Sequence, residues 1–297
     1  YIFAFDDESL RILNELALKQ ATIVSLKAFE SSELLEVKSQ RTQAEYCWTS
    51  TSSTILYCLK RFGLDHCIYL DADLYFYNDP IEIVKKAGDN SVIITPHNYT
   101  KKYDQSKTSG VYCVQFMYFK NDEQGLKVLN WWVNACIDWC YARFEDGKFG
   151  DQKYLDDWDT RFEGIYVTSD LGIGLAPWNV QQVKLLKEKD KFYVVNKKSG
   201  NKSALYFFHF HGLKFLNNNS IDLGDYQLEP DIISRLYKPY ILELLAQYNK
   251  VKLLTKNTRI KSEIGSEINP SAIKKIILRK VKGEWNVKDL DKFISHY

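Results

Sequence analysis

The fold of this chain is decided by residues 66–80, which read HCIYLDADLYFYNDP. Residues 67–70 form an unbroken apolar run with the length of a buried β-strand. The run ends in two carboxylates, Asp71 and Asp73, with Ala72 between them. The tripeptide at 78–80, Asn-Asp-Pro, then indicates a turn and the start of a helix. The stretch therefore predicts a strand that delivers two carboxylates to the end of a sheet.

The two carboxylates predict a metal–diphosphate site. Carboxylates at the carboxyl end of a parallel strand lie where open α/β sheets bind ligands. Hard divalent cations prefer oxygen ligands, and Mg²⁺ sites often combine one or two carboxylates with substrate phosphates. The alternative is that Asp71 caps a turn and Asp73 is solvated, because a bare Asp-x-Asp is a common pattern.

Strand-like and helix-like segments alternate on both sides of this stretch. Such alternation predicts an α/β fold with a mostly parallel, mixed sheet flanked by helices. We expect a catalytic domain over residues 1–250 and a basic, helical C-terminal extension over 251–297. The strands are predicted at 1–5, 21–26, 67–70, 91–95, 110–119, 165–167, 191–195 and 205–210, and the main helices at 38–62, 122–144 and 232–248.

Composition narrows the class of protein. The chain has 297 residues, of which 45% are hydrophobic and 26% charged, as in ordinary globular proteins. A net charge of +2 does not favour a general nucleic-acid binder. No apolar run approaches the roughly 18 residues of a membrane-spanning helix. Most of the six cysteines lie in apolar runs, which fits reduced thiols and a cytoplasmic location.

Two further motifs carry candidate chemistry. Asp151 and Gln152 follow a glycine at the predicted start of a helix, where function is often found; the alternative is that Asp151 is a plain N-cap. Farther along, His209 and His211 alternate on one side of a strand, directly before Gly212 and Lys214. A cation beside a glycine turn favours an anion site, whereas the alternative is a core histidine that is satisfied by its neighbours.

With these three motifs in this order, the chain resembles the A-type-fold nucleotide-sugar glycosyltransferases. It is most similar to the retaining family of glycogenin and the bacterial lipopolysaccharide galactosyltransferases, over residues 1–215. The resemblance implies a Rossmann-like A-type glycosyltransferase fold, with its first strand upstream of residue 1. It also implies a hexosyltransferase that moves a sugar from a nucleotide-diphosphate sugar, a UDP-sugar, to a hydroxyl of a glycan or glycolipid. The setting would be the synthesis of lipopolysaccharide, capsule or another bacterial surface polysaccharide.

The resemblance also implies roles for individual residues. Asp71, Asp73 and His209 would be the ligands of Mn²⁺ or Mg²⁺, with His211 as the alternative to His209. Ala72, Gly212 and Lys214 would contact the donor's diphosphate. Asp151 would contact the donor sugar, and Gln152 would lie on the face where a retaining enzyme stabilises an oxocarbenium-like state.

Some positions depart from the family pattern. Tyr46–Trp48 stands where the family has a donor-contacting Arg, so Arg41 or Lys38 would have to substitute for it. Cys113 or Gln115 stands near the family's donor-facing Asn. A sugar-nucleotide-binding pseudoenzyme and a scaffold of a polysaccharide assembly complex are therefore alternative functions.

Two features lie outside these motifs. Trp178 either stacks on a sugar ring or packs in the core. Residues 272–281 form a short, basic amphipathic helix, which either contacts an anionic membrane peripherally or packs on the domain.

Overall fold

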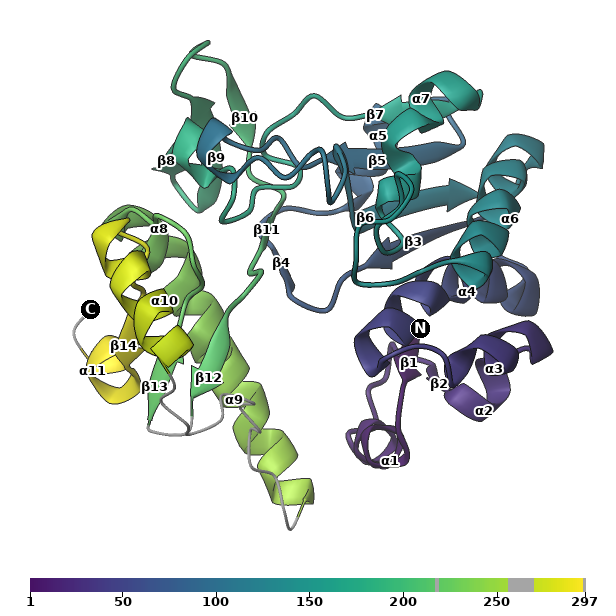
Figure 1. Cartoon of the computed structure of the whole chain (residues 1–297), viewed down its shortest axis with the longest axis horizontal. Helices are drawn as coiled ribbons and strands as arrows, with labels where there is room; N and C mark the ends of the chain where they lie inside the picture. Colours follow the sequence, from purple (N-terminus) through teal and green to yellow (C-terminus); the bar gives the residue numbers. More distant parts are fainter. Residues whose placement is uncertain (217–218, 256–269, 296–297) are drawn as a thin grey trace. The chain divides into compact units, whose positions relative to one another are not determined.

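The computed structural model describes residues 1–216, 219–255 and 270–295. It is a mixed α/β structure, as predicted, and it contains several separate sheets. The chain forms two compact units, one of Tyr1–Ala72 and Asp79–Asp170, the other of Asp73–Asn78 and Leu171–Tyr297 (Figure 1). The predicted domain boundary at residue 250 falls inside a helix of the second unit, α9 (Lys238–Leu254).

The first unit carries most of the predicted strands and helices. Its strands are β1 (Ile2–Ala4), β2 (Ile23–Ser25), β3 (His66–Leu70), β5 (Val92–Pro96), β6 (Tyr112–Lys120) and β7 (Ile165–Val167). Its α-helices are α1 (Asp7–Glu15), α2 (Leu26–Phe29), α3 (Ser32–Lys38), α4 (Gln43–Phe62), α5 (Ile81–Lys86), α6 (Glu123–Asp138) and α7 (Trp158–Arg161), and its 3₁₀ helices are η1 (Lys101–Tyr103) and η2 (Lys153–Asp157).

The main sheet of this unit has the strand order β3-β6-β5-β7. Only β5 and β7 pair in parallel in this sheet, whereas β6 runs antiparallel to both β3 and β5. The prediction of a mostly parallel sheet is therefore wrong for this sheet. The connection between β5 and β6 contains the short helix η1 in place of a crossover α-helix, and β6 returns antiparallel beside β5. The small β1–β2 pair is parallel.

Helices α4 and α6 are placed by strong end signals and by apolar faces. A capping box at Thr42 and Glu45 starts α4, and Gly63 ends it in the left-handed conformation that glycine adopts without steric cost. Asp122 caps α6 by accepting from the backbone of Gly125. The apolar residues of both helices are buried in one core with the strands, including Ile55, Leu59, Val128, Leu129, Trp132, Met117 and Phe119.

The second unit contains β4 (Leu74–Phe76), a strand that is absent from the predicted elements. Its other strands are β8 (Val183–Glu188), β9 (Lys191–Asn196), β10 (Lys202–Ala204), β11 (Phe207–His209), β12 (Lys214–Leu216), β13 (Ser220–Asp222) and β14 (Val287–Asp289). Its helices are the 3₁₀ helix η3 (Val180–Gln182), α8 (Pro230–Ile232), the π-helix η4 (Ile233–Tyr237), α9, α10 (Pro270–Val281) and α11 (Leu290–Ser295).

The C-terminal segment 270–295 is built into the second unit. Strand β14 pairs with β13 and completes the three-stranded sheet β12-β13-β14. Phe293 of α11 is buried in the same core as Phe210 and Tyr237. Residues 256–269 and 296–297 of the predicted extension lie outside the described residues. Among the helices that the structure describes, none has the length and apolarity that crossing a membrane requires.

Candidate functional site

The site is centred on the antiparallel pairing of β4 with β11. In this register Leu74 faces His209 and Phe76 faces Phe207. The backbone N–H of Phe210 donates to the carbonyl of Asp73 at 2.9 Å. The pairing therefore fixes the second carboxylate of the Asp-x-Asp motif beside the His-Phe-His segment, although the two lie far apart in the sequence.

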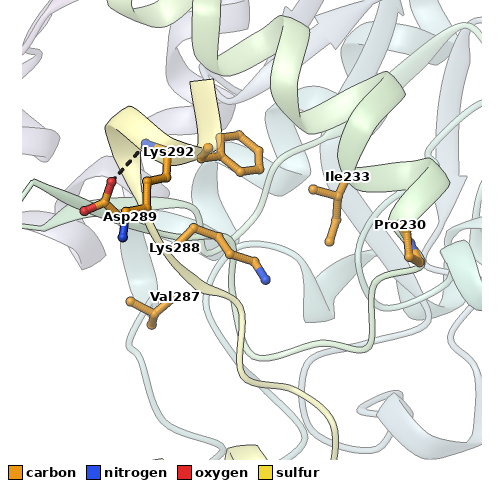
Figure 2. A pocket seen from close by; sticks show the side chains of 7 residues that line it. Pro230, Ile233, Val287, Lys288, Asp289 and Lys292 are labelled. Atoms are coloured by element: carbon orange, nitrogen blue, oxygen red, sulfur yellow. Dashed lines mark hydrogen bonds between the residues drawn. The ribbon is translucent and has the colours of Figure 1, made fainter. Parts of the chain in front are cut away.

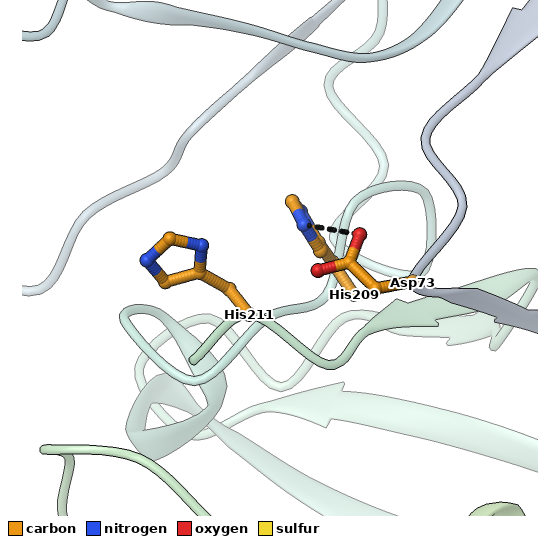
Figure 3. A group of neighbouring side chains, drawn as sticks. All are labelled: Asp73, His209 and His211. Atoms are coloured by element: carbon orange, nitrogen blue, oxygen red, sulfur yellow. Dashed lines mark ion pairs between the residues drawn. The ribbon is translucent and has the colours of Figure 1, made fainter. Parts of the chain in front are cut away.

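Three side chains, Asp73, His209 and His211, gather at this point (Figure 3). Oδ1 of Asp73 lies 3.0 Å from Nε2 of His209, and one ligand atom from each of the three residues lies within 4.8 Å of the others. His209 is buried, whereas His211 and Asp73 keep access to solvent. One carboxylate and two imidazoles at this spacing form a donor set suited to a borderline divalent cation such as Mn²⁺ or Zn²⁺.

The pKa values of two members of the group, Asp73 and His211, are both lowered. Burial alone would raise the pKa of Asp73, but the hydrogen bond from His209 and the charges of both histidines outweigh it and leave the pKa below its ordinary value. Packing around the ring and the charge of His209 lower the pKa of His211, and Lys214 acts in the same direction. Carboxylate and neutral imidazole are the forms that coordinate metals.

Trp178 packs against both histidines. Its ring centroid lies 5.2 Å from that of His209 and 5.5 Å from that of His211, edge-on in each case. The Trp178 side chain is buried. Of the two alternatives for Trp178, these contacts favour packing behind the histidines over stacking on a sugar.

Gly212 and Lys214 follow the group directly. Gly212 has φ +81°, a left-handed conformation that suits glycine at the turn from β11 into β12. Lys214 begins β12 with an exposed side chain, and its charge contributes to the lowered pKa of His211. A cation is therefore available beside the group for an anionic ligand.

The other predicted metal ligand, Asp71, belongs to the first unit, as does the exposed Ala72. The backbone N–H of Asp71 donates to the carbonyl of Gln115 at 3.0 Å. The hydroxyl of Tyr69 donates to Oδ1 of Asp71 at 2.9 Å. The metal-ligating role of Asp71 stays a prediction. Gln115 and Tyr69, which form these two hydrogen bonds with Asp71, belong to the same unit as Asp71.

Asp151 is a buried carboxyl group of the first unit. Burial and the charge of Asp71 raise its pKa to about 7, although a hydrogen bond with the Thr51 side chain opposes the shift. Trp132 Nε1 donates to the backbone carbonyl of Asp151 at 2.9 Å. Helix η2 begins at Lys153 and its N-cap is Gln152, without a side-chain cap, so Asp151 is not the N-cap of this helix.

Gln152 forms a hydrogen bond with the loop that precedes β6. Its Nε2 donates to the carbonyl of Ser109 at 2.8 Å. Lys153 Nζ donates to the carbonyl of Ser106 at the same distance. The polar loop 101–110 is therefore held by hydrogen bonds from Gln152 and Lys153. A role of Gln152 toward the donor sugar stays a prediction.

The candidates for a substitute donor cation are engaged within the first unit. The guanidinium of Arg41 is buried against the ring of Tyr141, 3.8 Å from its centroid, and Nη2 donates to the carbonyl of Ile137. Lys38 forms an ion pair with Glu30. Gln115, one of the two residues predicted near the family's donor-facing Asn, is buried. Its side-chain amide donates to Oγ1 of Thr95 at 3.4 Å.

A separate hollow of about 410 Å³ lies in the second unit (Figure 2). Two lysines border it, and Oδ1 of Asp289 accepts from the backbone N–H of Lys292 at its edge. None of the predicted site residues lines it; the lining residues are Pro230, Ile233, Val287, Lys288, Asp289, Lys292 and Phe293.

Sequence reasoning kept His211 only as an alternative to His209, whereas the structure brings both histidines to Asp73. The His-x-His alternation carried the signal, although β11 ends at His209 and His211 lies in the turn that follows it. The contribution of Trp178 had no such signal, because its contact with the histidines depends on the packing of separate segments.

No family model matches the chain. Over 250 residues it is 26% identical to the uncharacterized protein YfnD of Bacillus subtilis strain 168, which covers 82% of the chain and 78% of YfnD. Over 229 residues it is 32% identical to the uncharacterized protein YfnF of the same organism, which covers 74% of each.

Proposed function

The chain belongs to the same family as Bacillus subtilis YfnF, and we propose that it is a metal-dependent glycosyltransferase. Its donor is a nucleotide-diphosphate sugar, a UDP-sugar, and its acceptor is a hydroxyl of a glycan or glycolipid. An A-type glycosyltransferase fold, retention at the anomeric carbon and a place in surface-polysaccharide synthesis are parts of the proposal that rest on the resemblance of the motifs alone.

The observation that carries the proposal is the group of Asp73, His209 and His211. A carboxylate of the Asp-x-Asp motif, the last residue of β11 and a histidine of the turn after β11 come together, with one ligand atom from each within 4.8 Å of the others. Three further features support the fit: the lowered pKa values of Asp73 and His211, and the nearby cation of Lys214.

In this proposal, three residues bind the cation and Lys214 binds the diphosphate. Asp73, His209 and His211 would hold the cation, and their two nitrogens favour Mn²⁺ over Mg²⁺, which prefers an all-oxygen shell. A divalent ion there would act as a Lewis acid that neutralises the charge growing on the leaving diphosphate. Lys214, beside Gly212, would bind phosphate oxygens and add to this stabilisation.

The roles of the motif residues in the first unit rest on the resemblance. Asp71 and Ala72 complete the Asp-x-Asp motif, and Asp151 and Gln152 form the Gly-Asp-Gln motif that faces the donor sugar in the resembled family. A carboxyl group with a pKa of about 7 is poised to donate or accept a hydrogen bond near neutral pH. We assign Asp151 to contact the sugar hydroxyls in this way.

The first test is calorimetric titration of UDP with and without Mn²⁺. We expect binding that requires Mn²⁺ in the wild type and falls at least tenfold in Asp73→Asn, since a neutral amide is a much weaker ligand than a carboxylate. Asp190→Asn is the matched control, because Asp190 is an exposed carboxylate in the turn after β8. Equal affinity of the Asp73→Asn and Asp190→Asn variants would overturn the metal assignment.

A nucleotide-sugar-binding protein without transferase activity is the second candidate. The contacts of Arg41 with Tyr141 and of Lys38 with Glu30 favour it. These contacts occupy the two cations that would have to replace the family's donor-contacting Arg. Hydrolysis of a UDP-sugar in the presence of Mn²⁺ separates the two. Turnover that is abolished by Asp73→Asn supports the enzyme, whereas Mn²⁺-dependent binding without turnover supports the binding protein.

We also propose a peripheral position on the cytoplasmic face of an anionic membrane. Helix α10 turns the cationic Arg279 inward, where it is buried, and turns apolar side chains outward. Ile277, Leu278 and Val281 are 55%, 45% and 80% exposed. Lysines flank this apolar face, as expected of a helix that lies on anionic lipid.

A further inference from the structure

We propose that Arg279 and Asn286 are positioning residues for His211. They lie in the C-terminal segment 270–295, outside the motifs that the resemblance covers. The inference rests on the proposed metal site, and it identifies what holds the most exposed ligand of that site. His209 is buried and paired with Asp73, whereas His211 is exposed and needs its neighbours to fix its position.

The C-terminal segment forms hydrogen bonds and ion pairs with residues 222–226, which are the end of β13 and the loop that follows it. Nη1 and Nη2 of Arg279 donate to both carboxylate oxygens of Asp222 at 2.7 Å, and Nη2 also donates to the carbonyl of Gly224 at 3.0 Å. Nε lies 2.9 Å from Oδ1 of Asp225. A buried, bidentate guanidinium–carboxylate pair holds one geometry, because the planar fork fits only one arrangement of the oxygens.

Asn286 holds the same loop from a second point. Its Nδ2 donates to the carbonyl of Gly224 at 2.9 Å and to that of Tyr226 at 2.7 Å. The carbonyl of Gly224 thus accepts from both Arg279 and Asn286. The loop's backbone is therefore fixed by side chains of the C-terminal segment, and we call this set of contacts the loop clamp.

The clamped loop packs directly on His211 and Gly212. A Cβ added to Gly224 would lie 3.4 Å from the carbonyl oxygen of His211 and 3.5 Å from the ring of Tyr226. A Cβ added to Gly212 would lie 3.7 Å from Cα of Gly224. The ring of Tyr226 stands edge-on to that of His211, with centroids 6.4 Å apart.

The loop clamp thus fixes the position of Gly224 and Tyr226, which pack against His211. The ring of His211 also packs edge-on against the rings of His209 and Trp178, with centroids 5.7 Å and 5.5 Å away. Groups behind a metal ligand fix its orientation, and their loss commonly lowers metal affinity by about 10- to 100-fold. Release of the loop would allow the His211 ring to move away from Asp73 and His209.

The test compares Mn²⁺ affinity, measured by electron paramagnetic resonance on the full chain, with amide hydrogen exchange of the metal-free protein over residues 210–214. Arg279→Lys keeps the charge but loses the bidentate fork, and Asn286→Ala releases the two carbonyls. We expect both variants to bind Mn²⁺ about 10-fold or more weakly and to exchange faster over 210–214. Tyr226→Ala removes the ring contact but leaves the clamp intact, and we expect weaker Mn²⁺ binding without loss of the fold.

Asp291→Ala is the matched control. It breaks a hydrogen bond from Asn219 that also joins the C-terminal segment to the β12–β13 hairpin, away from the loop, and should leave both readouts unchanged. Wild-type Mn²⁺ affinity in folded Arg279→Lys, Asn286→Ala and Tyr226→Ala would overturn the positioning role while leaving the metal site in place. A wild-type protein that binds no Mn²⁺ would overturn the metal site itself, and the positioning role with it.

Discussion

At the scale of single residues, the two units place carboxyl groups in opposite electrostatic settings. Asp73 is paired with His209 and stays ionised over a wide pH range, because its pKa is lowered. Asp151 is buried near the charge of Asp71, and its pKa is raised to about 7. The two shifts have different local causes: a hydrogen bond and nearby imidazoles lower the pKa of Asp73, whereas burial and a like charge raise that of Asp151.

The raised pKa of Asp151 predicts a pH-dependent stability. Its folded pKa lies above the ordinary value of 3.8, so the folded state binds this proton more tightly than the unfolded state. The resulting stabilisation is complete below the unfolded pKa and is lost as the pH rises through about 7. Between pH 5 and 8 the free energy of unfolding should fall by on the order of 2 kcal/mol from this group.

Asp151→Asn should remove this dependence and stabilise the protein at pH 8. Urea unfolding of wild type and variant at several pH values measures the effect. Asp138→Asn, at the exposed end of α6, is the control that should keep the wild-type slope. An unchanged slope in Asp151→Asn would contradict the assignment of the titration to this carboxyl.

At the scale of elements, the short strands β4 and β11 position the candidate metal site, and one face of α10 forms the proposed membrane-contact surface. Strand β4 has only three residues, and it is stabilised by pairing with β11 rather than by its own length. Helix α10 is unusual in burying a cation and exposing apolar side chains. An amphipathic helix that packs on a protein normally does the reverse, and this exposed apolar face is what the proposed membrane contact rests on.

The exposed face of α10 predicts binding to anionic vesicles. The wild type should sediment with vesicles that contain phosphatidylglycerol and not with pure phosphatidylcholine, because lysines beside the face are attracted to anionic headgroups. The double variant Ile277→Ser/Val281→Ser should bind roughly tenfold more weakly, since each partly embedded apolar side chain contributes about 1 kcal/mol. These side chains are exposed, so the fold should be unaffected.

Leu253→Ser is the control for the vesicle experiment. Leu253 is 87% exposed but lies on α9, outside the proposed membrane face. Binding that responds equally to both variants, or that ignores lipid charge, would contradict membrane contact through α10.

At the scale of the whole molecule, the chain divides the Asp-x-Asp motif between two units. Asp71 lies in the segment Tyr1–Ala72 of the first unit, and Asp73 begins the six-residue segment Asp73–Asn78 that belongs to the second. The C-terminal segment 270–295 is equally part of the second unit, through β14, Phe293 and Arg279. Each unit is thus assembled from segments that are distant in the sequence.

A chain truncated after residue 255 should lose stability in the second unit. The truncation would remove β14 from the sheet, Phe293 from the core and the guanidinium partner of Asp222, so the free energy of unfolding should fall. Scanning calorimetry should show a lower transition temperature. Arg235→Ala breaks an exposed pair with Asp231 and should change the midpoint little. An unaltered midpoint in the truncated chain would contradict an integral role of the segment.

The amino-acid sequence by itself determined the α/β class, the strands β3, β5 and β6, and the candidacy of Asp73 and His209. Apolar runs and helical periodicity carry these features, and both are local properties of the chain. Helix ends were less well determined: α6 stops at Asp138, short of the predicted Phe144.

Only the tertiary structure decided the antiparallel course of β6, the pairing of β4 with β11, the convergence of His211 on Asp73, and the burial that raises the pKa of Asp151. Strand pairing depends on which segments meet, and a three-residue strand has too little intrinsic preference to be recognised alone. Burial and electrostatic shifts likewise arise from residues far apart in the sequence, so no local pattern records them.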